Sequence, residues 1–208
     1  MELHPVASGA RSSWNHNTHF HPLVLRGLRI GATALDVGCG EGLLSRRMLA
    51  AGAGHVTGLD ASAPMIELAR GLSAGEPRAT ALDYVVADVL DAAELGTFDL
   101  VACVATLHHL GLDRGLERLR GLTAPGGRLV VVGLARPSTA LDRALDGWSV
   151  PVNRVATAVR GYWEHPAPVR DADETYDDVR AAAARTLPGS TFRSRLYWRY
   201  TIEWRAPA

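Results

Sequence analysis

Leu35-Asp36-Val37-Gly38-Cys39-Gly40-Glu41-Gly42 is the stretch that decides the fold. It joins residues 33–37, which read as a short buried strand, to residues 42–51, whose apolar positions repeat at helical spacing. Glycines at such a junction let the backbone approach a ligand and expose N–H groups at the helix N-terminus. The turn alone is a weak signal, because any tight strand-to-helix connection can use glycine.

Four further apolar segments predict strands, and helical stretches separate them. These segments are residues 55–59, 82–87, 98–105 and 128–134. Near-continuous Val and Leu runs are typical of parallel strands that are buried on both faces. We therefore expect an α/β protein with a mostly parallel sheet and helices on both faces.

The last third of the chain lacks the regular alternation of apolar strands and helices. Residues 138–160 read as helical, with an interruption at Pro151, and residues 162–168 read as a loop. A second helix is expected over residues 174–187. The tail 191–204 is rich in aromatic residues and predicts one or two edge strands, which would pair antiparallel.

Composition narrows the class of protein. At 208 residues and 47% hydrophobic content, a single domain is expected. All 22 basic residues are arginine, which excludes Schiff-base lysine chemistry and a phosphate-loop lysine. The 22 acidic residues bring the net charge to zero, so we expect no nucleic-acid or membrane partner. No apolar signal-peptide core is apparent, and we expect a cytoplasmic monomer or weak homodimer.

Two aspartates close the strands that follow the glycine turn. Asp60 lies 20 residues after Gly40, where a carboxylate can accept both hydroxyls of a ribose. Asp88 closes the next strand, near the expected place of an adenine. Each has a purely structural alternative, since Asp60 could cap the following helix and Asp88 could stabilise a turn.

Several motifs together resemble the class I S-adenosylmethionine (SAM)-dependent methyltransferases. The resemblance covers roughly residues 30–135 and rests on motifs in the family's order: Leu35 to Gly42, Gly58-Leu59-Asp60-Ala61-Ser62 with Met65, Ala87-Asp88-Val89, Phe98 to Val101 leading to Leu107-His108-His109-Leu110, and Leu122 to Leu129 with Pro125-Gly126-Gly127. It implies a Rossmann-like, seven-stranded sheet with an antiparallel C-terminal strand. It also divides the single domain into an N-terminal helical lid (1–30), a cofactor-binding core (31–136) and an acceptor-side insert with the C-terminal strands (137–208).

The resemblance also implies which residues bind SAM. The glycine turn would pass beneath the methionine part, ordered by Asp36, while Ala61 and Met65 would pack on the adenine. Met65 could equally be an ordinary core residue. The implied cofactor-binding residues are Asp36, Gly38, Cys39, Gly40, Asp60, Ala61, Met65, Asp88 and Val89.

The expected activity is methyl transfer to an oxygen or nitrogen of a small organic acceptor. A hydroxyl acceptor requires a base, and His108 is the candidate, because it follows the fourth strand at the carboxyl edge. A structural or cofactor-side role for His108 stays open. The candidate acceptor-binding residues are Trp14, His16, His19, Phe20, His109, Trp163 and His165. No metal site is expected, because the spacing of the three N-terminal histidines sends His21 to another helical face.

Three rival functions are compatible with parts of this pattern. An RNA or protein methyltransferase would need a basic surface or a peptide groove, and the sequence indicates neither. A nicotinamide dehydrogenase also uses a glycine turn and an acid about 20 residues further on, but Asp36 before the turn and the antiparallel tail argue against it. A non-catalytic SAM-binding protein would share the cofactor residues without turnover.

Overall fold

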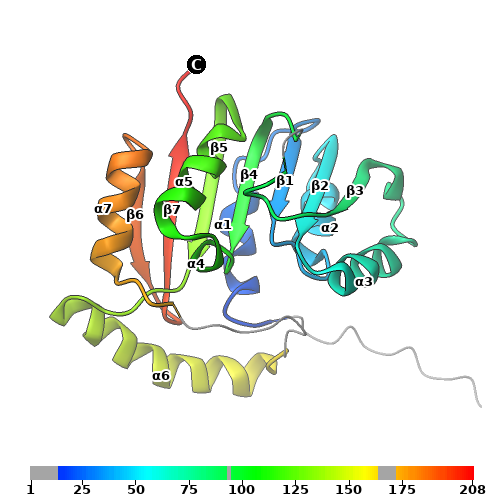
Figure 1. Ribbon diagram of the computed structural model, residues 1–208. Coiled ribbons are helices and arrows are strands. Elements are labelled where there is room, and N and C mark those ends of the chain that lie inside the picture. Colours follow the sequence, from blue (N-terminus) through cyan, green and yellow to red (C-terminus); the bar gives the residue numbers. More distant parts are fainter. Residues whose placement is uncertain (1–13, 93–94, 164–171) are drawn as a thin grey trace, which may run out of the picture.

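A computed structural model describes residues 14–92, 95–163 and 172–208 (Figure 1). Its strands are β1 (Thr33–Val37), β2 (His55–Asp60), β3 (Leu82–Val86), β4 (Phe98–Val104), β5 (Thr123–Gly133), β6 (Thr191–Arg195) and β7 (Arg199–Arg205). Its helices are α1 (His21–Leu25), α2 (Leu43–Ala50), α3 (Ala63–Ser73), α4 (Leu107–Leu110), α5 (Leu112–Gly121), α6 (Ala140–Arg160) and α7 (Tyr176–Thr186), with short 3-10 helices η1 (Thr18–Phe20) and η2 (Ala79–Ala81).

The seven strands form one sheet in the order β3-β2-β1-β4-β5-β7-β6. Strands β1 to β5 are parallel, β7 pairs antiparallel to β5, and β6 pairs antiparallel to β7. The chain builds outward from β1 to β3 and then returns to place β4 on the other side of β1. This reversal leaves a crevice at the carboxyl ends of β1 and β4, which is where ligands bind in sheets of this kind.

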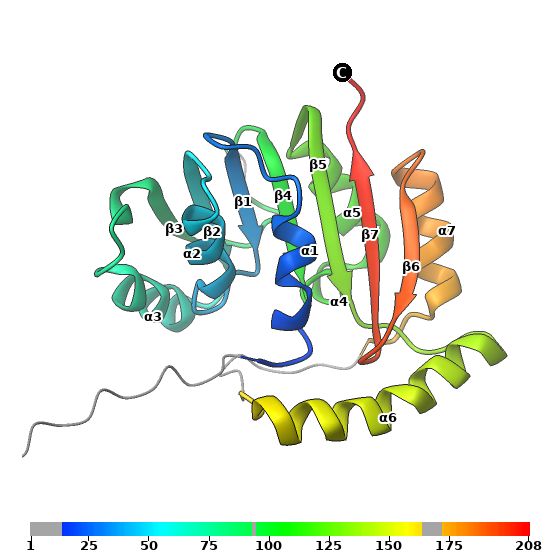
Figure 2. The same ribbon diagram turned by 180° about the vertical axis from the view of Figure 1, so that it is seen from behind.

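Helices cover both faces of the sheet (Figures 1 and 2). Alternate side chains of each central strand enter opposite layers: Leu35 and Val37 pack with α5 and α7, whereas Ala34 packs with α1, α2 and α3. Both layers are buried, which explains the continuous apolar runs of the central strands. Helix α6 is the exception, because it lies across the carboxyl edge of the sheet (Figure 2).

The mostly parallel sheet, its antiparallel C-terminal strands and the flanking helices confirm the predicted fold class. One detail of the prediction is wrong, since α6 continues through Pro151. A proline removes one helical hydrogen bond, to the carbonyl four residues earlier. Here that carbonyl belongs to Gly147, and both residues are exposed, so water can replace the lost donor. The turn at Pro125-Gly126-Gly127 falls within the bounds of β5, as a register shift against β4.

Candidate functional site

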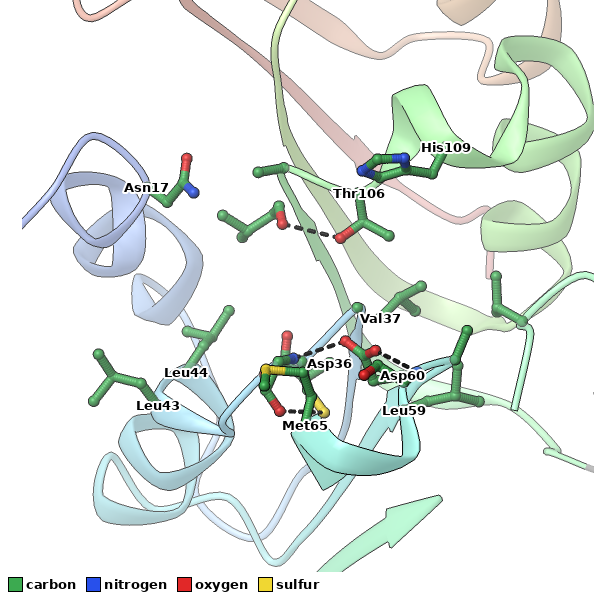
Figure 3. A pocket seen from close by; sticks show the side chains of 18 of the residues that line it. Asn17, Asp36, Val37, Leu43, Leu44, Leu59, Asp60, Met65, Thr106 and His109 are labelled. Carbon is green, nitrogen blue, oxygen red and sulfur yellow. Dashed lines mark hydrogen bonds between the residues drawn. The ribbon is translucent and has the colours of Figure 1, made fainter. Parts of the chain in front are cut away.

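A cavity of about 390 Å³ lies at the carboxyl edge of the sheet (Figure 3). This volume is within the range of small-molecule and cofactor sites. The loops after β1, β2, β3 and β4 contribute to its lining, as do α2, the N-terminal segment and Trp163. All nine residues expected to bind the cofactor line it: Asp36, Gly38, Cys39, Gly40, Asp60, Ala61, Met65, Asp88 and Val89.

The glycine turn after β1 is held tightly against the strand ends. The backbone N–H groups of Gly38 and Cys39 donate to the Leu59 carbonyl at 2.7 and 3.0 Å. Gly38 has a φ of +70°, and a Cβ placed on it would lie 2.0 Å from Thr106 Oγ1. Only glycine fits there, because both the backbone conformation and the neighbouring threonine exclude a side chain.

Asp60 braces this turn. Its Oδ2 accepts from the Gly40 N–H at 2.9 Å, and its Oδ1 accepts from the Ser62 N–H at 2.8 Å. Each carboxylate oxygen keeps acceptor capacity for a further donor, so Asp60 can order the turn and bind a ligand hydroxyl. Asp88 likewise lines the cavity and stabilises a turn, because its Oδ1 accepts from the Leu90 N–H at 2.9 Å.

Asp36 is buried where β1 ends. The Ser45 hydroxyl on α2 donates to Asp36 Oδ2 at 2.7 Å, which ties the strand to the helix on the far side of the glycine turn. Burial raises the pKa of the Asp36 carboxyl to about 6, although the hydrogen bond from Ser45 opposes this shift. Asp36 therefore helps to fix the conformation of the glycine turn that joins β1 to α2.

The ionisable groups of the lining favour a cationic ligand. They include three aspartates, Asp36, Asp60 and Asp88, whereas none of the described lining residues is an arginine. A pyrophosphate would find no counter-charge there, but a sulfonium or ammonium group would. The described residues bring together no group of three or more His, Cys, Asp or Glu side chains that could hold a metal ion. Within the same residues, no helix is long and apolar enough to cross a membrane.

The N-terminal segment lines the cavity with residues that the sequence analysis missed, Asn17, Thr18 and His21. Asn15 sets their orientation, because its Oδ1 accepts the backbone N–H groups of Asn17 and Thr18, each at 2.9 Å. Arg199 on β7 then fixes the Asn17 side chain. Its Nε and Nη2 donate to Asn17 Oδ1 at 3.0 and 2.8 Å, which leaves the Asn17 amide N–H groups for the cavity (Figure 3).

Trp14, His16, His19 and Phe20 do not line the cavity. Trp14 and His16 instead form an aromatic cluster with Tyr162 and Tyr197, and the His19 ring contacts Tyr197 as well. The large rings pack together because burying them is favourable, and the small polar residues between them are left facing the ligand space. Trp163 does line the cavity, as expected, whereas His165 lies outside the described residues.

Helix α1 packs on one face of the sheet, with Val24 fully buried, and the residues that reach the cavity are those just before it and at its first turn. Within the described part of the predicted lid (1–30), this segment is what reaches the cavity, and its action as a lid stays a prediction.

The structure places His109, and not His108, on the cavity lining. Both lie on α4, and their ring centroids are 4.1 Å apart. Thr106, the residue just before α4, lines the cavity and donates from Oγ1 to the Val104 carbonyl at 3.1 Å. Ala105, also on the lining, has a φ of +54°, which is unusual for a residue with a side chain. After this sharp turn, His109, which was expected among the acceptor-binding residues, lines the cavity, whereas His108, the expected base, does not.

Fold and site together define an α/β protein that binds a nucleoside-type cofactor at the carboxyl edge of a parallel sheet. Residues 35–131 match the model of a methyltransferase domain family. An uncharacterized methyltransferase of Mycobacterium tuberculosis is 38% identical over 200 residues, which cover 93% of this chain and 98% of that protein. The chain therefore belongs to the class I SAM-dependent methyltransferase family.

Other relatives are more distant. A ubiquinone biosynthesis O-methyltransferase of Paraburkholderia xenovorans is 35% identical over 142 residues, or 61% of this chain and 59% of that protein. Among solved structures, magnesium protoporphyrin IX methyltransferase from Synechocystis with bound SAM aligns with a TM-score of 0.61 and 20% identity, covering 92% of this chain and 79% of the other. The N-methyltransferase NodS of Bradyrhizobium japonicum aligns with a TM-score of 0.60 and 17% identity over 92% of this chain and 96% of its own. These structural likenesses concern the fold.

Proposed function

We propose that this methyltransferase methylates an oxygen of a small organic acceptor, with His109 as the general base. The observation that carries the proposal is the position of His109, which lines the cavity and is also exposed to solvent. An imidazole in that place can accept the proton of a hydroxyl and release it to water. Thr106 and Leu110 beside it supply a polar contact and an apolar wall for the acceptor.

SAM fits the other end of the cavity. Asp60 would bind the ribose hydroxyls, Asp88 and Met65 would contact the adenine, and the glycine turn would support the methionine part. When bound there, the sulfonium supplies a methyl group that is already activated for transfer. The task of the protein is then to align the acceptor, exclude water and take up the proton of the hydroxyl.

Two other histidines near the cavity, His21 and His108, are less well placed than His109 to act as the base. His21 lines the cavity, but Arg47 Nη1 lies 2.9 Å from its Nδ1. Because arginine can only donate, this ring nitrogen is an acceptor that is already engaged. His108, the candidate from the sequence, is not among the lining residues. The 35% identical relative named as an O-methyltransferase supports an oxygen as the methylated atom.

The first test is a panel of phenols, catechols, alcohols and amines, with formation of S-adenosylhomocysteine as the readout. On an accepted hydroxyl substrate, His109→Gln should lower kcat by about 10²-fold or more and abolish the acid limb of the pH–rate profile. The neighbouring substitution His108→Gln is the matched control and should retain both. Loss of activity in His108→Gln, with His109→Gln active, would return the role of base to His108; turnover of amines alone would reject oxygen methylation.

A further inference from the structure

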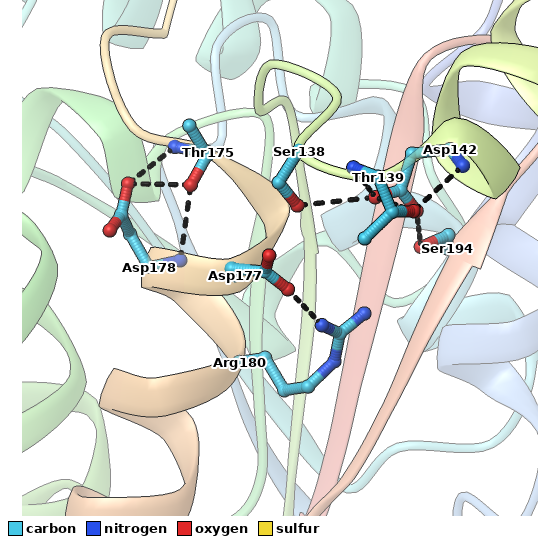
Figure 4. A network of polar contacts seen from close by, with 8 residues as sticks. All are labelled: Ser138, Thr139, Asp142, Thr175, Asp177, Asp178, Arg180 and Ser194. Atoms are coloured by element: carbon cyan, nitrogen blue, oxygen red, sulfur yellow. Dashed lines mark hydrogen bonds and ion pairs between the residues drawn. The ribbon is translucent and has the colours of Figure 1, made fainter.

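Helix α6 turns its polar residues toward the protein. Asp142 and Ser149 are buried on its inner face, and Asn153 follows one turn further on. Ser194 Oγ donates to Asp142 Oδ1 at 3.0 Å, and the Tyr197 N–H donates to Ser149 Oγ at 2.9 Å. Figure 4 shows the contact with Ser194 beside the capping box at the start of the helix. The inner face also has apolar contacts, because Val152 and Ala156 pack against the core, but its most buried side chains are polar, whereas surface helices ordinarily bury an apolar stripe.

A stripe of exposed apolar side chains runs along most of α6. Leu141, Trp148, Val155 and Val159 share one face of the helix by their spacing, and they are 78%, 68%, 65% and 78% exposed. Ten large hydrophobic side chains are exposed among the described residues, and with Val150 five of them belong to α6. A continuous apolar surface of this kind marks a site of contact with another surface.

The exposed charges of α6 are all positive. They belong to Arg143, Arg154 and Arg160, of which Arg160 lies over the Trp14 ring, so Arg143 and Arg154 are the outward charges. Asp142 and Asp146 lie on the inner face, one buried and the other half-buried. A second copy of α6 would offer these arginines no exposed carboxylate, because the helix has none. A layer of anionic lipid headgroups supplies the counter-charge, and the apolar stripe matches the acyl boundary beneath it.

We propose that α6 docks this protein on an anionic lipid surface, with Trp148 and its apolar neighbours entering the headgroup layer. The zero net charge of the chain does not oppose this, because the contact depends on the local distribution of charge. The helix lies across the carboxyl edge of the sheet, the side on which the cavity lies (Figures 1 and 2).

The end of α6 connects this surface to the site. His16 Nε2 and Asn153 Oδ1 are 2.8 Å apart, and the Trp163 N–H donates to the Trp14 carbonyl at 2.9 Å. Trp163 itself lines the cavity, as does Asn17 next to His16. Taken with the proposed function, on which this step rests, the docked orientation favours an organic acceptor that partitions into a bilayer.

Cosedimentation of the full chain with vesicles tests the docking. Vesicles of phosphatidylglycerol and phosphatidylcholine in equal parts should bind the protein, and vesicles of phosphatidylcholine alone should bind it much less. The double variant Trp148→Ser/Val155→Ser should weaken binding about tenfold or more by removing apolar contact area. Arg143→Gln/Arg154→Gln should also weaken it about tenfold or more, and added salt should act in the same direction.

Ile30→Ser is the matched control, because Ile30 is 84% exposed and belongs to the loop before β1, outside α6. It should bind vesicles as the wild type does. Absence of vesicle binding, equal binding to neutral vesicles, or a wild-type dimer that the Trp148→Ser/Val155→Ser variant dissociates would each overturn the proposal. All variants should bind S-adenosylhomocysteine like the wild type, and neither readout requires an acceptor, so failure here is distinct from failure of the proposed function.

Discussion

The buried carboxyl group of Asp36 affects both the stability of the fold and the shape of the cavity. It lines the cavity, accepts the Ser45 hydroxyl and is only 2% exposed. Its folded-state pKa of about 6 lies above the ordinary value of 3.8, so the folded protein binds its proton more tightly than the unfolded chain does. The contribution of this proton to the free energy of unfolding is complete below pH 3.8, the ordinary pKa, and is lost as the pH rises through about 6.

Asp36→Asn should remove this pH dependence. Asparagine can still accept from Ser45, but it cannot ionise, so the variant should gain stability relative to the wild type by up to about 3 kcal/mol between pH 4 and pH 7. Urea unfolding at a series of pH values measures the difference. Asp91→Asn, at an exposed position outside the cavity, is the control and should show no such trend. A constant difference between Asp36→Asn and the wild type would mean that Asp36 does not carry the dependence.

The residues of the cofactor end could be predicted from the sequence, whereas those of the acceptor end could be predicted only in part: His109 and Trp163 were expected and line the cavity, but Asn17, Thr18 and His21 were not expected. Asp60 and Gly38 were predictable because strand ends and tight turns fix their place. The place of Asn17, and the choice of His109 over His108 as the histidine that faces the cavity, depend on local turns that spacing does not encode. The Asn15 side chain sets the first of these turns, and the left-handed backbone of Ala105 helps to set the second.

The contact between β7 and the N-terminal segment joins two elements that are far apart in the chain. Arg199 is 7% exposed, and burial lowers its pKa to about 10. Besides Asn17, it donates from Nη1 to the carbonyls of Tyr197 and Trp198 at 3.2 and 3.3 Å. The bonds to Asn17 hold a segment with little regular structure of its own at the rim of the cavity, and the bonds to the two carbonyls fix the arginine that makes them.

Arg199→Met should release that segment. The loss of several charge-assisted hydrogen bonds, offset by relief of the buried charge, should lower the free energy of unfolding by about 2 kcal/mol. Amide hydrogen exchange over residues 14–20 should accelerate more than exchange over β1. Arg193→Met, on the exposed side of β6, is the control. If residues 14–20 exchanged no faster in Arg199→Met than in Arg193→Met, the contact would not be what holds the segment.

Secondary structure was most predictable where one physical rule dominates. Buried parallel strands gave continuous apolar runs, and the first four were expected within a residue of their observed bounds, whereas β5 begins at Thr123, five residues before the predicted start, because the turn at Pro125 falls within it. Helix α6 escaped full prediction for two reasons. Pro151 suggested a break that an exposed helix tolerates, and the inward polar face is set by Ser194, Tyr197 and His16, which are distant in sequence.

For the molecule as a whole, one sheet supports two different surfaces at its carboxyl edge. The crevice between β1 and β4 holds the acidic cofactor end of the cavity, and α6 adds a basic, apolar outer surface beside it. The chain's even balance of charges conceals this separation. Composition therefore predicted the net charge but not the distribution of charge, which depends on the direction each helix faces.

Isothermal titration with S-adenosylhomocysteine, with NADH titrated in parallel, tests the assignment of this cavity to SAM most directly. The wild type should bind S-adenosylhomocysteine and not NADH. Asp60→Ala should weaken that binding about tenfold or more, because it removes a carboxylate acceptor for the ribose. Asp91→Ala should bind like the wild type. Binding of NADH instead, no binding at all, or equal affinity in a folded Asp60→Ala variant would contradict the assignment.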